Sequence, residues 1–289
     1  MPPLSRRQFI EGIGLSAAAL LTKGNIASAA SGERMRFGLV TYLWGEKWDL
    51  PTLIDNCEQS GVLGVELRTT HAHGVERSLS ASERSDVKKR FADSPVTFVG
   101  IGSNENYDNP KPDKLADAIE ATKAFIKLSH DVGGSGVKVK PNSFHDDVLR
   151  EKTIEQIGKS LNTLGEYGYG FGQEIRLEVH GQCAELPIIK QIMDIADHPN
   201  VAVCWNSNDQ DLLGEGLEHN FNLVKDRFGA TAHVRELNIG DYPYTDLIRL
   251  FVEMNYEGWV LLEARTKPED PIAALIEQRE LFEKMIGRS

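Results

Sequence analysis

Hydrophobic residues recur along the chain in eight short runs that are rich in β-branched side chains. Between the runs lie longer segments in which apolar residues return every three or four positions, as on one face of a helix. Ser80 and Glu83, at the start of one such segment, have the spacing of a capping box. The pattern therefore predicts eight strands that alternate with helices. The expected strands are residues 35–42, 63–68, 96–102, 136–140, 175–180, 201–205, 233–239 and 259–264.

Strict alternation of strands and helices indicates a parallel sheet, because each helix returns the chain to the start of the next strand. Eight such units match a closed (β/α)8 TIM barrel better than an open, doubly wound sheet. No GxGxxG motif follows the first strand, which disfavours a dinucleotide-binding fold. No low-complexity linker or break in composition interrupts the chain. We therefore expect residues 31–289 to form one TIM barrel domain.

The first 30 residues have a different character. Arg6 and Arg7 precede an apolar stretch and the small residues 27–30, which is the order of regions in an export signal. Paired arginines followed by Phe9 and Ile10 resemble the twin-arginine signal, which implies export of the folded protein by the twin-arginine machinery. The apolar stretch is too short to span a bilayer comfortably. We expect residues 1–30 to be removed and the mature protein to be periplasmic or otherwise exported, without a membrane anchor.

The net charge of the chain is −11. An acidic surface repels phosphate backbones, and no basic stripe with interleaved aromatic residues offsets it, so we expect no nucleic-acid partner.

Cys57, Cys183 and Cys204 are scattered along the chain. They indicate neither a disulfide framework nor a CxxC metal site.

Polar residues close most of the expected strands. In a TIM barrel the carboxyl ends of the strands surround the active site. Glu178 and His180 lie two positions apart, so both side chains should point to the same face. An ordinary strand followed by a polar loop explains one such case but not its recurrence. The other residues at expected strand ends are Glu66, Lys138, Lys140, Asn206, Glu236, Asn238 and Glu263.

The eight-unit pattern, with "LEVH" (177–180) closing the fifth expected strand and "LLEAR" (261–265) closing the eighth, resembles the xylose isomerase-like TIM barrels. The resemblance covers nearly all of residues 35–289. It implies a sugar isomerase or epimerase that holds one divalent cation, Mn²⁺ or Mg²⁺. The metal ligands in this superfamily are a Glu, an Asp, a His and a Glu from strands five to eight, and a His two residues after the first Glu contacts the sugar.

Carried over to this chain, the resemblance assigns the sugar contact to His180. The sixth-strand position holds Asn206 in place of Asp, and the seventh aligns Asn238 with the expected His. Amide oxygens also bind hard cations, but the lost charge and the lost nitrogen predict weaker binding. Glu236, on the face of Asn238, is a further candidate ligand, with a buried ion pair as its alternative role. The implied ligands are Glu178, Asn206, Asn238 and Glu263.

The resemblance also implies a mechanism. One of the two glutamates Glu178 and Glu263 removes a proton from the carbon beside a sugar carbonyl, and the other returns a proton. A cation, or Lys138 or Lys140, stabilises the charge on the carbonyl oxygen. The two lysines share a face of their strand, so both point inward or both extend along the rim.

Further residues are candidates for substrate contact. Trp44 follows the first expected strand and Trp205 ends the sixth, and an aromatic face can cover the C–H surface of a sugar. Glu66 ends the second expected strand. His71 and His73 have the spacing of a His-x-His metal pair, but no third nitrogen or sulfur ligand lies nearby, which favours a substrate-facing loop around His71.

Two other functions remain open at this point. A lyase or glycoside-cleaving enzyme acting on an oxidised (keto) sugar would use the same proton removal, and export favours it because free sugar phosphates are rare outside the cytoplasm. A non-catalytic sugar-binding protein would need only the altered ligand set. Endonuclease activity ranks last, because it needs a richer metal cluster and a surface that tolerates DNA. The sequence carries no signal for the oligomeric state.

Overall fold

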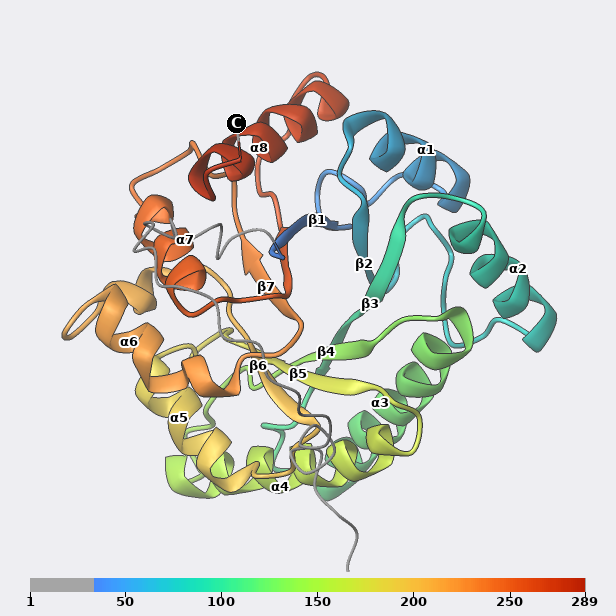
Figure 1. Ribbon diagram of the computed structural model, residues 1–289. Coiled ribbons are helices and arrows are strands. Elements are labelled where there is room, and N and C mark those ends of the chain that lie inside the picture. Colours follow the sequence, from blue (N-terminus) through green and yellow to red (C-terminus); the bar gives the residue numbers. More distant parts are fainter. Residues whose placement is uncertain (1–33, 289) are drawn as a thin grey trace, which may run out of the picture.

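A computed structural model describes residues 34–288, and the expected export signal at residues 1–30 lies outside them. Eight parallel strands form one sheet in the order β6-β5-β4-β3-β2-β1-β8-β7, and the helices surround it as an outer ring (Figure 1). This confirms the expected single TIM barrel. The strands are β1 (Arg36–Val40), β2 (Gly64–Arg68), β3 (Thr97–Asn106), β4 (Gly136–Lys140), β5 (Glu174–Glu178), β6 (Val201–Cys204), β7 (Thr231–Val234) and β8 (Trp259–Leu262).

The helices follow the strands one by one. The capping box at the start of α2 is present, because the Ser80 hydroxyl accepts from the Glu83 backbone N–H while the Glu83 carboxylate accepts from the Ser80 N–H. None of the helices in residues 34–288 has the length and apolarity needed to cross a bilayer. The helices are α1 (Leu50–Ser60), α2 (Ala81–Ala92), α3 (Pro112–Val132), α4 (Arg150–Tyr169), α5 (Leu186–Ile195), α6 (Leu217–Val224), α7 (Tyr244–Glu253) and α8 (Pro271–Met285), with short 3-10 helices η2 (Asp209–Leu212) and η3 (Lys225–Arg227).

Alternation along each strand separates an apolar layer from a charged interior. In β2, Val65 and Leu67 pack with the helices in the main core, so Glu66 between them points into the barrel. In β4, Val137 and Val139 flank Lys138 in the same way. The interior of the barrel therefore carries charged side chains, which must be paired because they have left water.

The barrel closes between β6 and β7 through isolated bridges rather than a continuous ladder. Val203 pairs with Phe228 and Asn206 pairs with His233. The His233 backbone N–H donates to the Trp205 carbonyl, and the Ser207 N–H donates to the His233 carbonyl at 3.2 Å. This pairing brings Asn206 and His233 to the same level of the barrel.

The seventh strand differs from the expected one. The sequence pattern placed it at residues 233–239, whereas β7 spans Thr231–Val234 and residues 237–240 form a turn. The strand thus begins and ends earlier than expected. As a result, His233 lies within the strand and points into the barrel, and the polar residues that follow belong to a loop.

Candidate active site

Glu178, the last residue of β5, is fixed by hydrogen bonds at both of its carboxylate oxygens. Its Oε2 accepts from the Lys138 ammonium at 2.7 Å, and its Oε1 accepts from the Asn206 amide nitrogen, also at 2.7 Å. Glu178 and Lys138 are fully buried. Burial by itself would raise the pKa of Glu178, but Lys138 and His233 outweigh it and hold the pKa well below its usual range. Glu178 is therefore an ionised carboxylate inside the barrel.

Lys138 is the matching buried cation. Burial would lower the pKa of its ammonium group, but the carboxylates of Glu178, Glu66 and Glu263 raise it above the ordinary value. The ammonium therefore stays protonated. A positive charge therefore lies next to the carboxylate of Glu178.

His233, from the short strand β7, occupies the centre of this group. Its Nδ1 lies 3.5 Å from Oε1 of Glu178, and its Nε2 lies 3.3 Å from Oε1 of Glu66. Neither approach has hydrogen-bond geometry, so both ring nitrogens and both Glu66 oxygens lack hydrogen-bond partners. Burial lowers the pKa of the imidazole, but the neighbouring Cys204, Glu66 and Glu178 side chains raise it well above its usual value.

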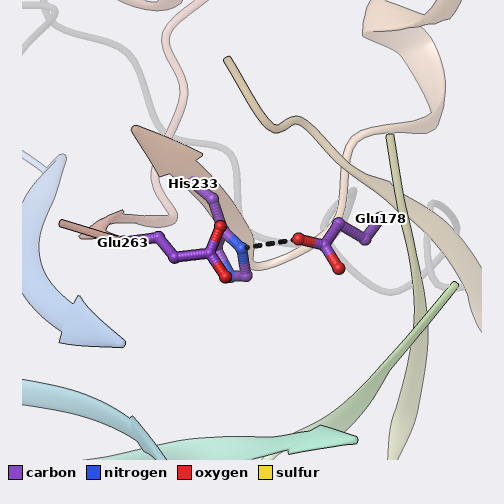
Figure 2. Close-up of side chains that lie close together, drawn as sticks. All are labelled: Glu178, His233 and Glu263. Carbon is purple, nitrogen blue, oxygen red and sulfur yellow. Dashed lines mark ion pairs between the residues drawn. The ribbon is translucent and has the colours of Figure 1, made fainter. Parts of the chain in front are cut away.

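Glu263 follows β8 and faces Glu178 from the other side. In Figure 2 the Glu178 and Glu263 side chains point toward each other from opposite sides of the view, and the His233 ring lies next to them. The Asn206 amide nitrogen, already bonded to Glu178, also donates to Oε2 of Glu263 at 3.4 Å. Nη1 of Arg68, at the end of β2, lies 3.8 Å from Oε1 of Glu263. One amide therefore bridges two carboxylates that are far apart in the sequence.

These residues fit a divalent cation. Glu178, His233 and Glu263 each offer one ligand atom, and the three atoms lie within 4.8 Å of one another. The amide nitrogen of Asn206 faces Glu178 and Glu263, and its Oδ1 is buried without a hydrogen-bond partner. A flip of the amide would turn this oxygen toward the group as a fourth donor. Two carboxylates, an imidazole and an amide oxygen suit Mg²⁺ or Mn²⁺, since Mn²⁺ accepts oxygen and nitrogen ligands alike.

Outside this buried group, four neighbouring strand ends form a polar rim. Nη2 of Arg68 and Nζ of Lys140 both donate to Oδ1 of Asn104, at 2.8 and 3.1 Å. Burial and the nearby Lys138 charge lower the pKa of Lys140 to about 8. His180 stands beside them after β5, and burial together with the nearby cations lowers its pKa to about 4, so the imidazole is neutral.

Asn238 does not join the group that the sequence assigned to it. Its side chain donates to Glu277 at 2.9 Å and accepts from Gln278 at 2.8 Å, and both partners belong to α8. Because β7 ends at Val234, Asn238 lies in the turn, and His233 takes the seventh-strand position. The sequence signal for His233 was the short run "TAHV" (231–234), which begins two residues before the expected strand.

Glu236 has a loop-fixing role in the structure. Its Oε1 accepts from the backbone N–H groups of Arg265 and Thr266, at 3.0 and 2.7 Å, and from the Thr266 hydroxyl at 2.6 Å. These bonds direct the carboxylate to the β8–α8 loop. The structure brings it neither to the metal-binding group nor into a buried ion pair, the two roles expected from the sequence.

The two tryptophans expected at the substrate are both buried, and Trp205 points away from the interior of the barrel. Trp205 is fully buried, and its ring centroid lies 5.7 Å from that of Phe221 and 6.0 Å from that of Phe228. Adjacent residues point to opposite faces, so Trp205 faces the helices where Asn206 faces the interior. Trp44 is also buried, and its indole N–H donates to the Thr266 carbonyl at 3.0 Å.

The histidine pair after β2 does not form a metal site. His73 uses both ring nitrogens on the backbone, with Nε2 at 2.7 Å from the Arg68 carbonyl and Nδ1 accepting from the Val75 N–H. The His71 ring lies 6.2 Å from the His73 ring, centroid to centroid, and its buried Nδ1 has no hydrogen-bond partner. This arrangement favours the loop interpretation of His71.

The chain belongs to the xylose isomerase-like TIM barrel family, whose sequence model matches residues 54–285. This confirms the resemblance stated from the strand-end motifs. Curated proteins give no sequence match to this chain.

Several solved structures share the fold. A 3-keto-D-glucoside 4-epimerase from E. coli, in its apo form, has a TM-score of 0.74 at 14% identity, covering 86% of this chain and 99% of its own. A D-psicose 3-epimerase determined in the presence of D-fructose has a TM-score of 0.71 at 14% identity, covering 88% and 100%. Another, from Clostridium cellulolyticum H10 with D-tagatose, has a TM-score of 0.69 at 14% identity, covering 87% and 98%. At such identities the comparison establishes the fold, and the roles of the site residues rest on geometry.

Proposed function

We propose that this protein is an exported sugar isomerase or epimerase that shifts a proton next to a sugar carbonyl. The observation that carries the proposal is the meeting of Glu178 and Glu263 around one buried centre with His233 and Lys138. Two carboxylates on opposite sides of a planar intermediate can exchange protons with both of its faces. The similar structures named as sugar epimerases support the same reaction class.

The side chains divide the chemistry among them. An ionised glutamate takes the proton from the carbon beside the carbonyl, and the electrons of that C–H bond form the C=C bond of an enediolate. The other glutamate, in its protonated form, gives a proton to the opposite face in an epimerisation. In an isomerisation the first glutamate can return its proton to the former carbonyl carbon, while the proton of the neighbouring hydroxyl passes to the former carbonyl oxygen and the C=O bond forms at the neighbouring carbon. Lys138 keeps Glu178 ionised for the first step and adds positive charge near the oxyanion.

We propose Mn²⁺ or Mg²⁺ as the cofactor, held by Glu178, His233, Glu263 and, after a flip of its amide, Oδ1 of Asn206. When bound, the cation would supply positive charge for the carbonyl oxygen and orient the sugar hydroxyls. His233 ligates only as the neutral imidazole, so it would lose its proton as the cation enters.

A lyase acting on a keto sugar is the second candidate. The observation that favours it is the similarity to a 3-keto-D-glucoside 4-epimerase, a protein named for a substrate that carries a ring carbonyl. Removal of the proton beside that carbonyl, followed by loss of a substituent from the next carbon, would form a C=C bond. The substituent would leave with the electrons of its C–O bond and take up a proton.

Solvent deuterium exchange tests the proposal. The purified mature protein is incubated in D₂O with Mn²⁺ and a panel of free, oxidised and phosphorylated sugars. We expect deuterium at the carbon beside the carbonyl in the recovered sugar. Glu178→Gln and Glu263→Gln should each lower exchange by about 10²–10⁴-fold, while Glu151→Gln, at an exposed position in the first turn of α4, should leave it unchanged.

The products separate the candidates. Deuterium in a recovered sugar supports the isomerase or epimerase, and an unsaturated or cleaved product supports the lyase. Saturable binding with no exchange points to the sugar-binding protein. Full turnover in both glutamine variants would rule out the two-carboxylate mechanism.

A further inference from the structure

The polar rim described above carries two cationic side chains, Arg68 and Lys140, that share a neutral hydrogen-bond acceptor. It is built at the carboxyl ends of four consecutive neighbours in the sheet: Arg68 from β2, Asn104 from β3, Lys140 from β4 and His180 after β5. Arg68 and Lys140 both direct an N–H group at one neutral acceptor, the Asn104 amide oxygen. Two cations that share a neutral acceptor repel each other across it, unless an anion lies between them.

The charges of the interior pair off without Lys140. Lys138 is bonded to Glu178, His233 lies against Glu66, and Arg68 approaches Glu263 at 3.8 Å. Within residues 34–288, no carboxylate forms an ion pair with Lys140, although its side chain is partly buried. Partial burial of a cation whose hydrogen-bond partner is neutral costs free energy of solvation. An anion that binds beside the cation would offset this cost.

Unused hydrogen-bond capacity lies at the same rim. Nε of Arg68 and Nδ1 of His180 are buried and have no hydrogen-bond partner. The Arg68 side chain is 16% exposed, and its guanidinium carries a planar set of donors, which matches the two oxygens of a carboxylate or phosphate. The guanidinium also lies over the Tyr42 ring, with its carbon 5.0 Å from the ring centroid, and this contact limits its movement.

We propose that Arg68 and Lys140, with Asn104 and His180, form a subsite for an anionic group of the substrate, so that the substrate is an acidic sugar. This inference rests on the proposed function and specifies its substrate class. The anionic group, a carboxylate or a phosphate, would lie at the rim over β2 to β4 while the carbonyl end of the sugar reaches Glu178 and Glu263. A bound anion would also offset the burial and the neighbouring cations that lower the pKa of Lys140 to about 8.

Calorimetric titration of the intact mature protein tests the subsite. The probes are D-glucuronate and D-galacturonate, the 6-phosphates of D-glucose and D-fructose, and the parent neutral hexoses. We expect at least one acidic probe to bind about tenfold or more tightly than its neutral parent. Lys140→Gln and Arg68→Gln should each remove about tenfold of that preference, and Lys140→Arg should restore most of it because the positive charge returns. The uronates and the phosphates distinguish the two kinds of anion.

Lys159→Gln is the matched control, because Lys159 lies on the exposed face of α4 and pairs with Glu155. It should leave every affinity unchanged. Equal or undetectable affinity for acidic and neutral probes would overturn the subsite, as would an acid preference that survives both rim variants. Deuterium exchange on the same panel is read separately: exchange with no acid preference removes the subsite alone, whereas acid-selective binding with no exchange removes the proposed reaction alone.

Discussion

Asn206 has a disproportionate influence on the chemistry of the interior. The amide nitrogen of Asn206 donates to Glu178 and Glu263. An aspartate at this position would place a negatively charged oxygen where Asn206 places two N–H hydrogens. Two carboxylates can therefore approach each other without a bound cation. The same residue weakens cation binding, because affinity for Mn²⁺ or Mg²⁺ rises with the charge of the ligands.

Asn206→Asp should strengthen metal binding. The variant places a third carboxylate beside Glu178 and Glu263, so we expect Mn²⁺ to bind about tenfold or more tightly, measured by calorimetric titration. Without metal, the melting temperature should fall, since three carboxylates then repel one another and the bridging donor is lost. Asn255→Asp, in the exposed loop before β8, makes the same charge change away from the site and serves as the control. Unchanged Mn²⁺ affinity in Asn206→Asp would count against the proposed ligand set.

At the scale of elements, the segment after β6 holds the loops around the barrel mouth together. Asp211, in η2, accepts from the Asn208 backbone N–H at 2.8 Å and from the Tyr242 hydroxyl at 2.7 Å. Its carbonyl accepts from the Asn220 amide of α6 at 2.8 Å. Burial of the carboxyl group outweighs these bonds and raises its pKa from 3.8 to about 7. The loop between β6 and α6 is thus tied to the loop after β7 by a group that titrates near neutral pH.

This titration predicts a pH dependence of stability. The pKa of Asp211 is higher in the folded chain than in the unfolded chain, so its contribution is fully favourable below about pH 4 and is lost as the pH rises through 7. The shift from 3.8 to about 7 corresponds to roughly 4 kcal/mol as an upper value. Urea unfolding of Asp211→Asn between pH 4 and 8 should show a flatter pH profile than the unmodified protein. Asp226→Asn, an exposed substitution in η3, should follow the unmodified profile, and an equally steep profile for Asp211→Asn would contradict the assignment.

At the scale of the whole molecule, the barrel decides which strand ends become neighbours. Glu178 ends β5 and Glu263 follows β8, and two further strands separate β5 from β8 in the chain. Closure of the sheet at β6 and β7 brings them to one centre, together with His233. A folded barrel with its charged interior already formed suits an export route that carries folded proteins.

We propose that the twin-arginine route exports the protein, and the paired arginines provide the test. Replacing both Arg6 and Arg7 by Lys should leave the protein in the cytoplasm, because that route requires the arginine pair. Cell fractionation with immunoblotting measures the distribution, and mass spectrometry of the exported form should show a new N-terminus close to residue 31. Replacing Lys23 by Arg is the control and should not change the distribution. Equal export of the double lysine variant would exclude this route.

Much of the fold was predictable, and so was part of the site. The strand-end positions of Glu178, Glu263 and Lys138 followed from period-two alternation and from the rule that barrel strands end at the site. The seventh strand was not predicted correctly, because β7 is only four residues long and the polar residues after it continue an alternating pattern. Placing the end of that strand five residues too late, at 239 in place of 234, assigned the strand-end role of His233 to Asn238.

The sequence by itself determined the eight alternating units, the acids that close them and the family to which the chain belongs, because periodicity and strand-end chemistry are local properties. Only the tertiary structure decided that Asn206 bridges two glutamates, that Trp205 packs against α6, and that Arg68 and Lys140 share one acceptor. These outcomes depend on the register between strands and on barrel closure. A shift of one residue in register turns a side chain from the interior to the helices, and no local pattern fixes that shift across strands far apart in the chain.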